Sequence, residues 1–269
     1  MLKKIIVAMV NVSILGCGWL GKPLATYLIE KKYIVKGSTT SDTKLRTLKE
    51  KGIQPFLIDI DEDTNKDIQK FLTSDVLIIA ITSKNVLGFK GLINELEKST
   101  IKKVIFVSAT SVYPSLNKEM TEEDETINSP LVEIENAFKE NINFETTIIR
   151  FAGLFNNDRN PGNWFENKKI PHPKGYVNMI HQDDCVEIIY QIIQQDVFGE
   201  LFNACSNHHP TREAFYTNAK QKLKKTTPIF DDSLPLKYKI INSDKVQKRL
   251  GYTFIYDDLL SLIKDNLDK

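Results

Sequence analysis

The chain has 269 residues, 41% of them hydrophobic, and its 36 lysines and arginines nearly balance its 35 aspartates and glutamates, for a net charge of +1. The length suffices for one large domain or for a nucleotide-binding domain with a smaller partner. The balanced charge offers no basic surplus to nucleic acid, so a small molecule is the expected ligand. No apolar run approaches the roughly 18 residues that span a bilayer. These features exclude a nucleic-acid-binding or membrane protein.

Three cysteines, Cys17, Cys185 and Cys205, are widely spaced along the chain. Their odd number and spacing fit neither a disulfide framework nor a metal site. We therefore expect a cytoplasmic protein without a bound metal.

Up to Arg150, short β-rich apolar runs alternate with longer amphipathic runs, which is typical of β-α-β units on a parallel sheet. The run Val76–Ile81 is apolar without alternation, which predicts helices on both faces of the sheet. The predicted fold class is α/β, a Rossmann-type doubly wound parallel sheet. Strands are expected at Val12–Leu15, Tyr33–Ser38, Gln54–Ile58, Val76–Ile81, Val104–Ser108 and Thr146–Phe151, and helices at Leu20–Lys32, Asp42–Lys51, Thr64–Leu72, Leu87–Lys98 and Pro130–Glu140.

After Arg150 the sequence becomes rich in Asn, Pro and Gly, and Asn156–Lys174 is predicted as a long loop that contacts the substrate. The chain is accordingly divided into a nucleotide-binding domain, 10–155, and a smaller α/β lobe, 156–269, interleaved with the same sheet. We expect a cleft at the carboxyl edge of the sheet. A strand is expected at Glu200–Ala204, and helices at Asp183–Gln194, Thr211–Leu223, Ser243–Leu250 and Tyr256–Leu267.

The glycine-rich stretch Gly16–Gly21 lies between the first predicted strand and the first predicted helix. In this context three glycines allow a tight turn, close approach of a pyrophosphate, and close packing of helix on sheet. A dinucleotide is therefore the first ligand hypothesis. The basic and apolar start of the chain, ending at Cys17, also resembles a lipoprotein signal, but cleavage before Cys17 would remove the first strand. Met9 is an alternative start, which would make residues 1–8 an extension.

Further motifs follow in order: SATSVYP at Ser108–Pro114, IRFAGLF at Ile149–Phe155, VNMIHQDD at Val177–Asp184, LFNA at Leu201–Ala204 and LGY at Leu250–Tyr252. Together with the glycine stretch, they resemble the extended short-chain dehydrogenase/reductases, also called the NAD-dependent epimerase/dehydratase family, and within it the atypical members. The resemblance runs from about Val12 to about Tyr256.

The resemblance implies a site for the cofactor. Gly16, Gly18, Trp19, Leu20 and Gly21 would face the pyrophosphate. Asp59 and Ile60 would border the adenine, Ala80, Ile81 and Thr82 would line the nicotinamide ribose, and Ser108 would lie beneath the ring. For Ala80 and Ile81 a packing role is an equal alternative, because strand ends in such a sheet are buried with or without a ligand.

The second predicted strand ends in hydroxyl-bearing residues, Ser38, Thr39, Thr40 and Ser41, and no acid occurs before Asp42. NAD sites usually place an acid here to bind the ribose 2′-hydroxyl. The hydroxyls, with Lys44 and Arg46 nearby, suit a 2′-phosphate better. NADP is therefore favoured over NAD, although Ser41 stands where related sequences often carry an arginine.

The family's proton-transfer groups are a Ser or Thr after the fifth strand and a Tyr-x-x-x-Lys pair on the next helix. The hydroxyl position is Ala109 here, and the helix reads PLVEIENA from Pro130. Two other Tyr-x-x-x-Lys spacings, Tyr27 with Lys31 and Tyr216 with Lys220, are interpreted as accidental. The remaining candidates for proton transfer are Thr110, Ser111, Tyr113, Glu133, Glu135 and His181, and for His181 a structural role at a helix start is the alternative.

Two functions stay open. One is an NAD(P)-dependent oxidoreductase or epimerase that acts on a sugar or nucleotide-sugar-like substrate through non-standard acid/base residues. The other is an NAD(P)-binding sensor or partner-binding module without catalysis. A β-hydroxyacid dehydrogenase, which shares only the first fifty or so residues, fits less well because of the strand predicted at Glu200–Ala204. The sequence leaves the oligomeric state open.

Overall fold

The computed structural model describes residues 10–62 and 66–261. The chain forms two compact units. Unit 1 comprises residues up to Val107, Glu133–Ile148 and Asp196–Glu200, and unit 2 comprises Ser108–Val132, Ile149–Gln195 and the residues from Leu201 onward. The domain boundary after residue 155 stays a prediction, and the alternative start at Met9 lies outside the described residues.

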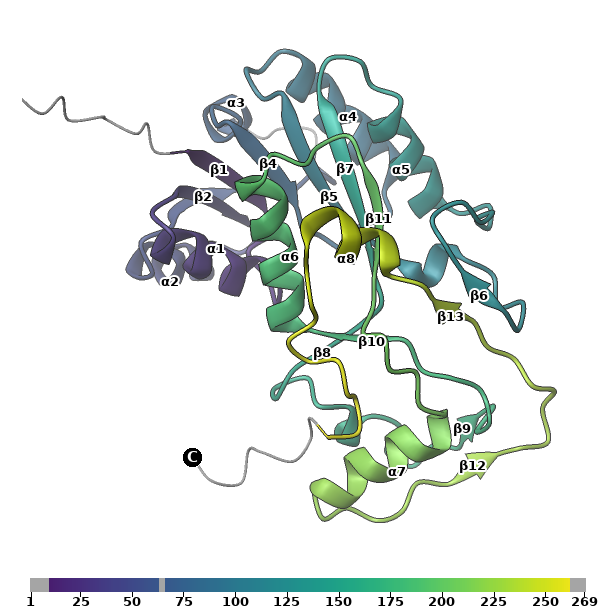
Figure 1. Cartoon of the computed structure of the whole chain (residues 1–269). Helices are drawn as coiled ribbons and strands as arrows, with labels where there is room; N and C mark the ends of the chain where they lie inside the picture. The colour runs from purple at the N-terminus through teal and green to yellow at the C-terminus, as the bar shows by residue number, and fades with distance from the viewer. Residues whose placement is uncertain (1–9, 63–65, 262–269) are drawn as a thin grey trace, which may run out of the picture. The chain divides into compact units, whose positions relative to one another are not determined.

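A seven-stranded parallel sheet has the order β11-β7-β5-β4-β1-β2-β3 (Figure 1). At its centre, β1 (Asn11–Leu15) pairs with β2 (Ile34–Thr39) and with β4 (Val76–Ile79), so that Val12 lies opposite Val35 and Val76. Successive strands run outward from β1 to β3 (Gln54–Leu57) and then cross back to β4 and β5 (Lys103–Ala109). This reversal beside β1 is the place where open α/β sheets bind ligands. The doubly wound α/β fold predicted from the sequence is confirmed.

Helices cover both faces of the sheet in unit 1 (Figure 1). Because β-α-β crossovers are right-handed, α1 (Gly21–Glu30) and α2 (Asp42–Glu50) lie on one face, and α3 (Ile68–Phe71) and α4 (Val86–Glu97) lie on the other. All four residues of β4 are buried, as its unbroken apolar sequence predicted. Phe138, on α5 (Pro130–Lys139), stacks on Phe106 with a centroid distance of 5.3 Å.

The strands predicted from the sequence are all present, with ends shifted by at most two residues. They include β7 (Glu145–Phe151) and β11 (Leu201–Ala204). The later helices are α6 (Gln182–Gln194), α7 (Arg212–Lys222) and α8 (Asp244–Leu250). Apolar periodicity located these elements because each buries one face. The helix predicted over Thr64–Leu72 is shorter, since only Ile68–Phe71 is helical among its described residues.

The helix predicted over Tyr256–Leu267 is wrong for residues 256–261, which form turns and irregular backbone. The N–H groups of Ile255 and Tyr256 donate to the Asp184 carboxylate at 2.7 and 3.1 Å, and Leu260 N–H donates to Asp258 Oδ1. Leu260 N–H thus bonds to a side chain in place of the Tyr256 carbonyl that a helix would supply. Residues 262–267 lie outside the described part of the chain.

Short parallel strand pairs in unit 2 were not predicted. They are β8 (Gly153–Phe155) with β10 (Met179–His181), β9 (Ile170–Pro171) with β12 (Phe230–Asp231), and β6 (Glu119–Met120) with β13 (Ile240–Ile241). Two or three residues carry too little periodicity to reveal a strand. Within the loop predicted at Asn156–Lys174, only the 3₁₀ turn η2 (Pro161–Asn163) and β9 are regular.

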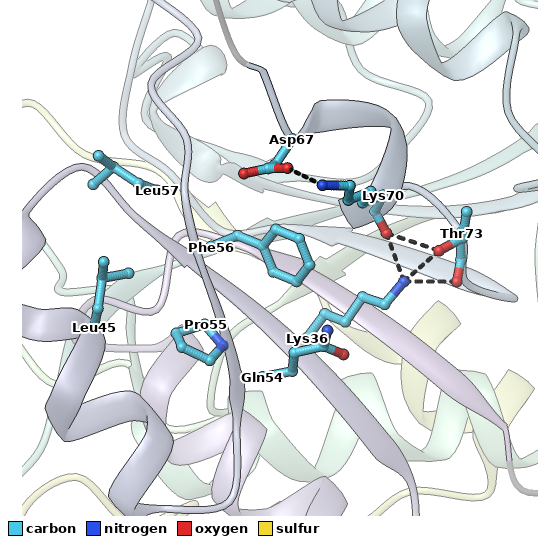
Figure 2. Close-up of a pocket in the computed structure, with 9 residues that line it drawn as sticks. All are labelled: Lys36, Leu45, Gln54, Pro55, Phe56, Leu57, Asp67, Lys70 and Thr73. Atoms are coloured by element: carbon cyan, nitrogen blue, oxygen red, sulfur yellow. Dashed lines mark hydrogen bonds and ion pairs between the residues drawn. The ribbon is translucent and has the colours of Figure 1, made fainter.

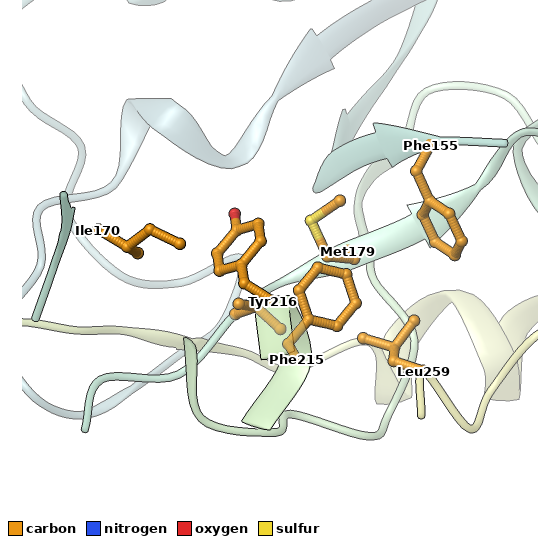
Figure 3. Close-up of a cluster of buried hydrophobic side chains, with 7 residues drawn as sticks. Phe155, Ile170, Met179, Phe215, Tyr216 and Leu259 are labelled. Carbon is orange, nitrogen blue, oxygen red and sulfur yellow. The ribbon is translucent and has the colours of Figure 1, made fainter. Parts of the chain in front are cut away.

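One apolar cluster in the core of unit 2 takes its residues from β8, β9, β10 and α7, together with Val177 and Leu259 (Figure 3). Phe215 is fully buried and Tyr216 is 5% exposed, while Trp164, Phe165 and Phe230 pack against the cluster. The loop residues Trp164 and Phe165 are therefore fastened to α7 by apolar contact.

Phe138→Ala is expected to lower the free energy of unfolding by about 3–5 kcal/mol, because a fully buried ring is deleted and leaves a cavity. Chemical denaturation measures the change. The matched control is Ile142→Ala, whose side chain is 97% exposed and whose loss is expected to change stability little. Equal effects of the two substitutions would contradict this account of the core.

Candidate functional site

The turn between β1 and α1 leaves no room for side chains at two of its glycines. Gly16 has φ +97°, and a Cβ there would lie 2.8 Å from the Ala80 carbonyl oxygen. A Cβ at Gly21 would lie 2.1 Å from the Gly16 carbonyl oxygen. By contrast, a Cβ at Gly18 would meet no atom of the described residues within 4 Å. Gly16 thus makes the turn, Gly21 lets α1 pack on it, and Gly18 leaves an open approach to the backbone.

The N-terminus of α1 follows directly on this turn. Within residues 10–62 and 66–261, no side chain hydrogen-bonds at its N-cap, Leu20, and its first turn carries no acidic residue. The N-terminus of a helix carries a positive partial charge. In α1, Lys22 N–H donates to the Gly18 carbonyl at 3.2 Å and Pro23 has no N–H, so the dipole rather than a full set of free N–H groups is what this end offers. Since Gly18 is exposed, this end of α1 is open to an anionic group.

Ser38, near the carboxyl end of β2, stabilises the glycine turn between β1 and α1 through two hydrogen bonds. Its Oγ accepts a hydrogen bond from Gly16 N–H at 2.9 Å, and its carbonyl accepts from Cys17 N–H at 2.8 Å. Cys17 is buried beneath the turn, and burial raises the pKa of its thiol to about 12. The hydroxyl of Ser38 therefore has a structural partner, which the sequence did not reveal.

The neighbouring hydroxyls continue from β2 into α2. Thr39 Oγ1 accepts from Ser41 N–H at 3.2 Å, and Ser41 Oγ lies 2.8 Å from Thr43 Oγ1. Thr40 and Lys44 are exposed. Arg46 pairs with Glu50 at 2.8 Å. Exposed hydroxyl and ammonium groups are thus gathered at this strand end.

The predicted adenine and ribose residues lie at the carboxyl ends of β3 and β4. Ala80 N–H donates to Leu15 O at 2.8 Å, and the Ala80 and Ile81 atoms border Gly16 directly. The Asp59 carboxylate accepts from Asp61 N–H at 3.0 Å, and the Ile60 carbonyl lies against Gly88 of α4. Thr82 is exposed. The structure brings Ala80 and Ile81 to the glycine turn, and cofactor contact at all five positions stays a prediction.

The carboxyl end of β5 supplies the predicted site residue Ser108, and the segment after β5 supplies Thr110, Ser111 and Tyr113. Ser108 and Thr110 are buried, and Ser111 in the 3₁₀ turn η1 (Thr110–Val112) is exposed. Tyr113 is only 2% exposed. Contact of Ser108 with a nicotinamide ring stays a prediction.

Tyr113 belongs to a buried polar network in unit 2. Its hydroxyl accepts from Arg150 Nη1 at 2.7 Å and donates to Asn203 Oδ1 at 2.9 Å. Asn203 N–H donates in turn to Glu122 Oε1 at 2.7 Å. Burial raises the pKa of Tyr113, although Arg150 opposes the shift, and burial also raises the pKa of Glu122. Glu122 could not be found from the sequence, because no motif surrounds it.

His181 caps α6, with its Nδ1 accepting from Asp183 N–H at 3.2 Å. Its ring packs on Tyr256 at 3.8 Å and meets Phe155 edge-on at 5.2 Å. Burial lowers the pKa of His181, although Asp183 opposes the shift, so the imidazole is neutral near pH 7. These contacts support the structural alternative for His181.

The helix that would carry a Tyr-x-x-x-Lys pair, α5, contains no tyrosine. Glu133 on this helix is exposed and pairs with Lys90 at 3.1 Å, and Glu135 is buried. Of the two spacings interpreted as accidental, the first has Lys31 5.0 Å over the Tyr27 ring, and in the second Tyr216 belongs to the apolar cluster of unit 2.

A pocket of about 600 Å³ lies beside the edge strand β3 and is lined by none of the predicted site residues (Figure 2). The Lys36 ammonium donates to the Lys70 carbonyl and to both oxygens of Thr73. Its three protons are therefore used within unit 1, and burial lowers its pKa. No cluster of metal-ligating side chains occurs in the described ranges, and none of their helices is long and apolar enough to cross a membrane.

Comparisons with known proteins extend over nearly the whole chain. Protein YeeZ of Escherichia coli K12 is 29% identical, covering 94% of this chain and 98% of that protein. A structure from Methylobacillus flagellatus, designated an NAD-dependent epimerase/dehydratase, is 22% identical with a TM-score of 0.77 and covers 94% of this chain and 96% of that chain. The chain therefore has the fold of the NAD-dependent epimerases and dehydratases.

A second structure with this fold is UDP-glucuronic acid 4-epimerase from Bacillus cereus, in complex with UDP-glucuronic acid and NAD. It is 18% identical, has a TM-score of 0.77, and covers 94% of this chain and 96% of that chain. No family model matches the sequence. The resemblance read from the motifs is confirmed at the level of the fold.

Replacing His181 with Asn is expected to flatten the dependence of stability on pH between about 7 and 5. The folded pKa of His181 is lowered, whereas the unfolded chain takes up a proton near pH 6.5. The unfolded state then binds more protons, so the free energy of unfolding falls as pH falls. Asn retains a capping oxygen. Urea titrations at several pH values measure the slope, and an identical slope in both proteins would contradict the shift.

Proposed function

We propose that the chain binds a dinucleotide, NAD or NADP, with its pyrophosphate at the turn between β1 and α1 in unit 1. The observation that carries the proposal is the different geometry of the three glycines. Gly16 and Gly21 are closed to any side chain, while the space at Gly18 is open beside the uncapped N-terminus of α1. An anionic ligand there would gain hydrogen bonds and a favourable dipole. Structures of this fold in complex with NAD support the choice of ligand class.

We further propose that NADP is preferred over NAD. Thr40 and Lys44 are exposed beside Ser41 and Thr43, and α2 starts at Asp42 without a side-chain cap from the described residues. A 2′-phosphate needs donors of this kind, whereas a ribose 2′-hydroxyl is usually bound by an acid at the strand end. Asp42 is the first residue of α2 and follows these hydroxyls, so its negative charge would repel a 2′-phosphate and opposes the preference for NADP.

Gly18→Ala is expected to weaken the binding of NADPH by at least about tenfold while the protein stays folded. The added methyl meets no described atom in the structure but occupies the approach to the pyrophosphate. Isothermal titration calorimetry with NADPH and NADH measures both affinities, and NADPH is expected to bind more tightly in the wild type.

The matched control is Gly91→Ala on α4, where an added Cβ likewise meets nothing within 4 Å among the described residues. Its cofactor affinity is expected to equal that of the wild type. If neither cofactor binds at millimolar concentration, the proposed function is wrong. Tighter binding of NADH would overturn the NADP preference alone.

As an enzyme, the protein would exchange hydride between the cofactor and a sugar-like or nucleotide-sugar-like substrate. A bound cofactor supplies the hydride chemistry. Nucleotide sugars bound to structures of the same fold support this substrate class. In this chain, groups other than a Tyr-Lys pair would have to transfer the proton. Of the candidates, Ser111 is exposed, whereas Tyr113 and His181 are buried.

A second function, a cofactor-binding sensor without catalysis, is favoured by Ala109 and by the tyrosine-free α5. Incubation of the protein with NADPH and a panel of keto-sugars separates the two. If the protein is an enzyme, we expect it to consume NADPH with at least one of the keto-sugars. The loss of the near-ultraviolet absorbance of the reduced nicotinamide measures this consumption. Tight NADPH binding without consumption on any member would favour the sensor.

A further inference from the structure

Arg212 is the first residue of α7, and its guanidinium lies against two aromatic rings of unit 2. Its Cζ is 5.7 Å from the centroid of Tyr216, one helical turn along α7, and 5.9 Å from that of Phe165. The two rings meet edge-on at 5.1 Å, and Trp164 lies 6.4 Å from Tyr216. Phe165 from the loop and Tyr216 from α7 thus form an aromatic surface on which the Arg212 guanidinium lies.

No described carboxylate pairs with Arg212, and its Nε is buried without a hydrogen-bond acceptor. Nearby, the Glu166 carboxylate is already paired with Lys225 at 2.6 Å, and Lys225 also donates to Asn163 Oδ1 at 2.7 Å. A buried donor without an acceptor costs free energy that a bound acceptor would restore. The local arrangement therefore leaves the Nε–H of Arg212 without an acceptor among the described residues.

We infer that Arg212 binds an oxyanion with two oxygens, a carboxylate or a phosphate, carried by the substrate of this protein. A guanidinium presents donors in a planar fork that matches two such oxygens, and aromatic faces fix its plane. The side chains of Trp164 and Phe165 offer apolar surface to a ring attached to that anion. The inference rests on the proposed function, because it assigns the anionic group of a sugar-like or nucleotide-sugar-like substrate to this residue.

A purely structural role would also place Arg212 on aromatic rings, through cation–π attraction. Lysine retains the charge and this attraction but lacks the planar fork. Arg212→Lys therefore separates the two roles. Arg249 near the end of α8 is exposed and provides the matched control, Arg249→Lys.

The test is calorimetric titration of the full chain with UDP, UDP-glucuronic acid and glucuronic acid. We expect Arg212→Lys to weaken the binding of at least one probe by tenfold or more, with Arg249→Lys unchanged. Loss for UDP identifies a phosphate as the anion, and loss confined to the two uronates identifies a carboxylate. The melting temperature of Arg212→Lys is expected to stay within a few degrees of the wild type.

Equal binding by the wild type and Arg212→Lys, or no binding of any probe at millimolar concentration, would overturn the inference. NADPH is titrated into the same proteins. If NADPH binds and the probes do not, only the role of Arg212 fails. If NADPH does not bind but a probe depends on Arg212, the proposed cofactor site fails and the anion site stands.

Discussion

The close contact between Gly21 and the carbonyl of Gly16 is the constraint on which the candidate cofactor site depends. A Cβ at position 21 would lie only 2.1 Å from the Gly16 carbonyl oxygen, so any side chain there would push α1 away from the turn. The same contact keeps the N-terminus of α1 against the turn, beside the open space at Gly18. Packing of the helix on the sheet and placement of its positive dipole end beside Gly18 therefore follow from one steric requirement.

Side chains at the neighbouring strand end keep this turn in place. Ser38 binds the Gly16 amide, and Cys17 fills the space against Gly37, whose own Cβ would lie 2.4 Å from the Cys17 sulfur. In unit 2, hydrogen bonds join Arg150, Tyr113, Asn203 and the half-buried Glu122 into a connected network. The network links segments that are distant in sequence, although the Asn203 Nδ2 group is buried without an acceptor among the described residues.

The sequence predicted the sheet and most of its helices because their buried faces repeat with a fixed period. It also placed the glycine turn correctly between β1 and α1. It could not predict partners distant in sequence, such as Glu122 with Asn203 or Asp184 with Ile255, because each depends on the completed fold. In the segment after Tyr256, which was mistaken for a helix, Leu260 N–H donates to the Asp258 side chain, a local competition that periodicity does not reveal. Arg212 gave no signal either, because its position against Phe165 and Tyr216 depends on the completed fold.

The measurement that tests the central claim most directly is a crystal structure of the protein grown with NADPH. The account predicts pyrophosphate oxygens within hydrogen-bonding distance of the backbone N–H groups between Gly18 and Gly21, with the pyrophosphate passing over the bare Cα of Gly18. A cofactor bound elsewhere on the chain, for example in the pocket beside β3, would contradict it.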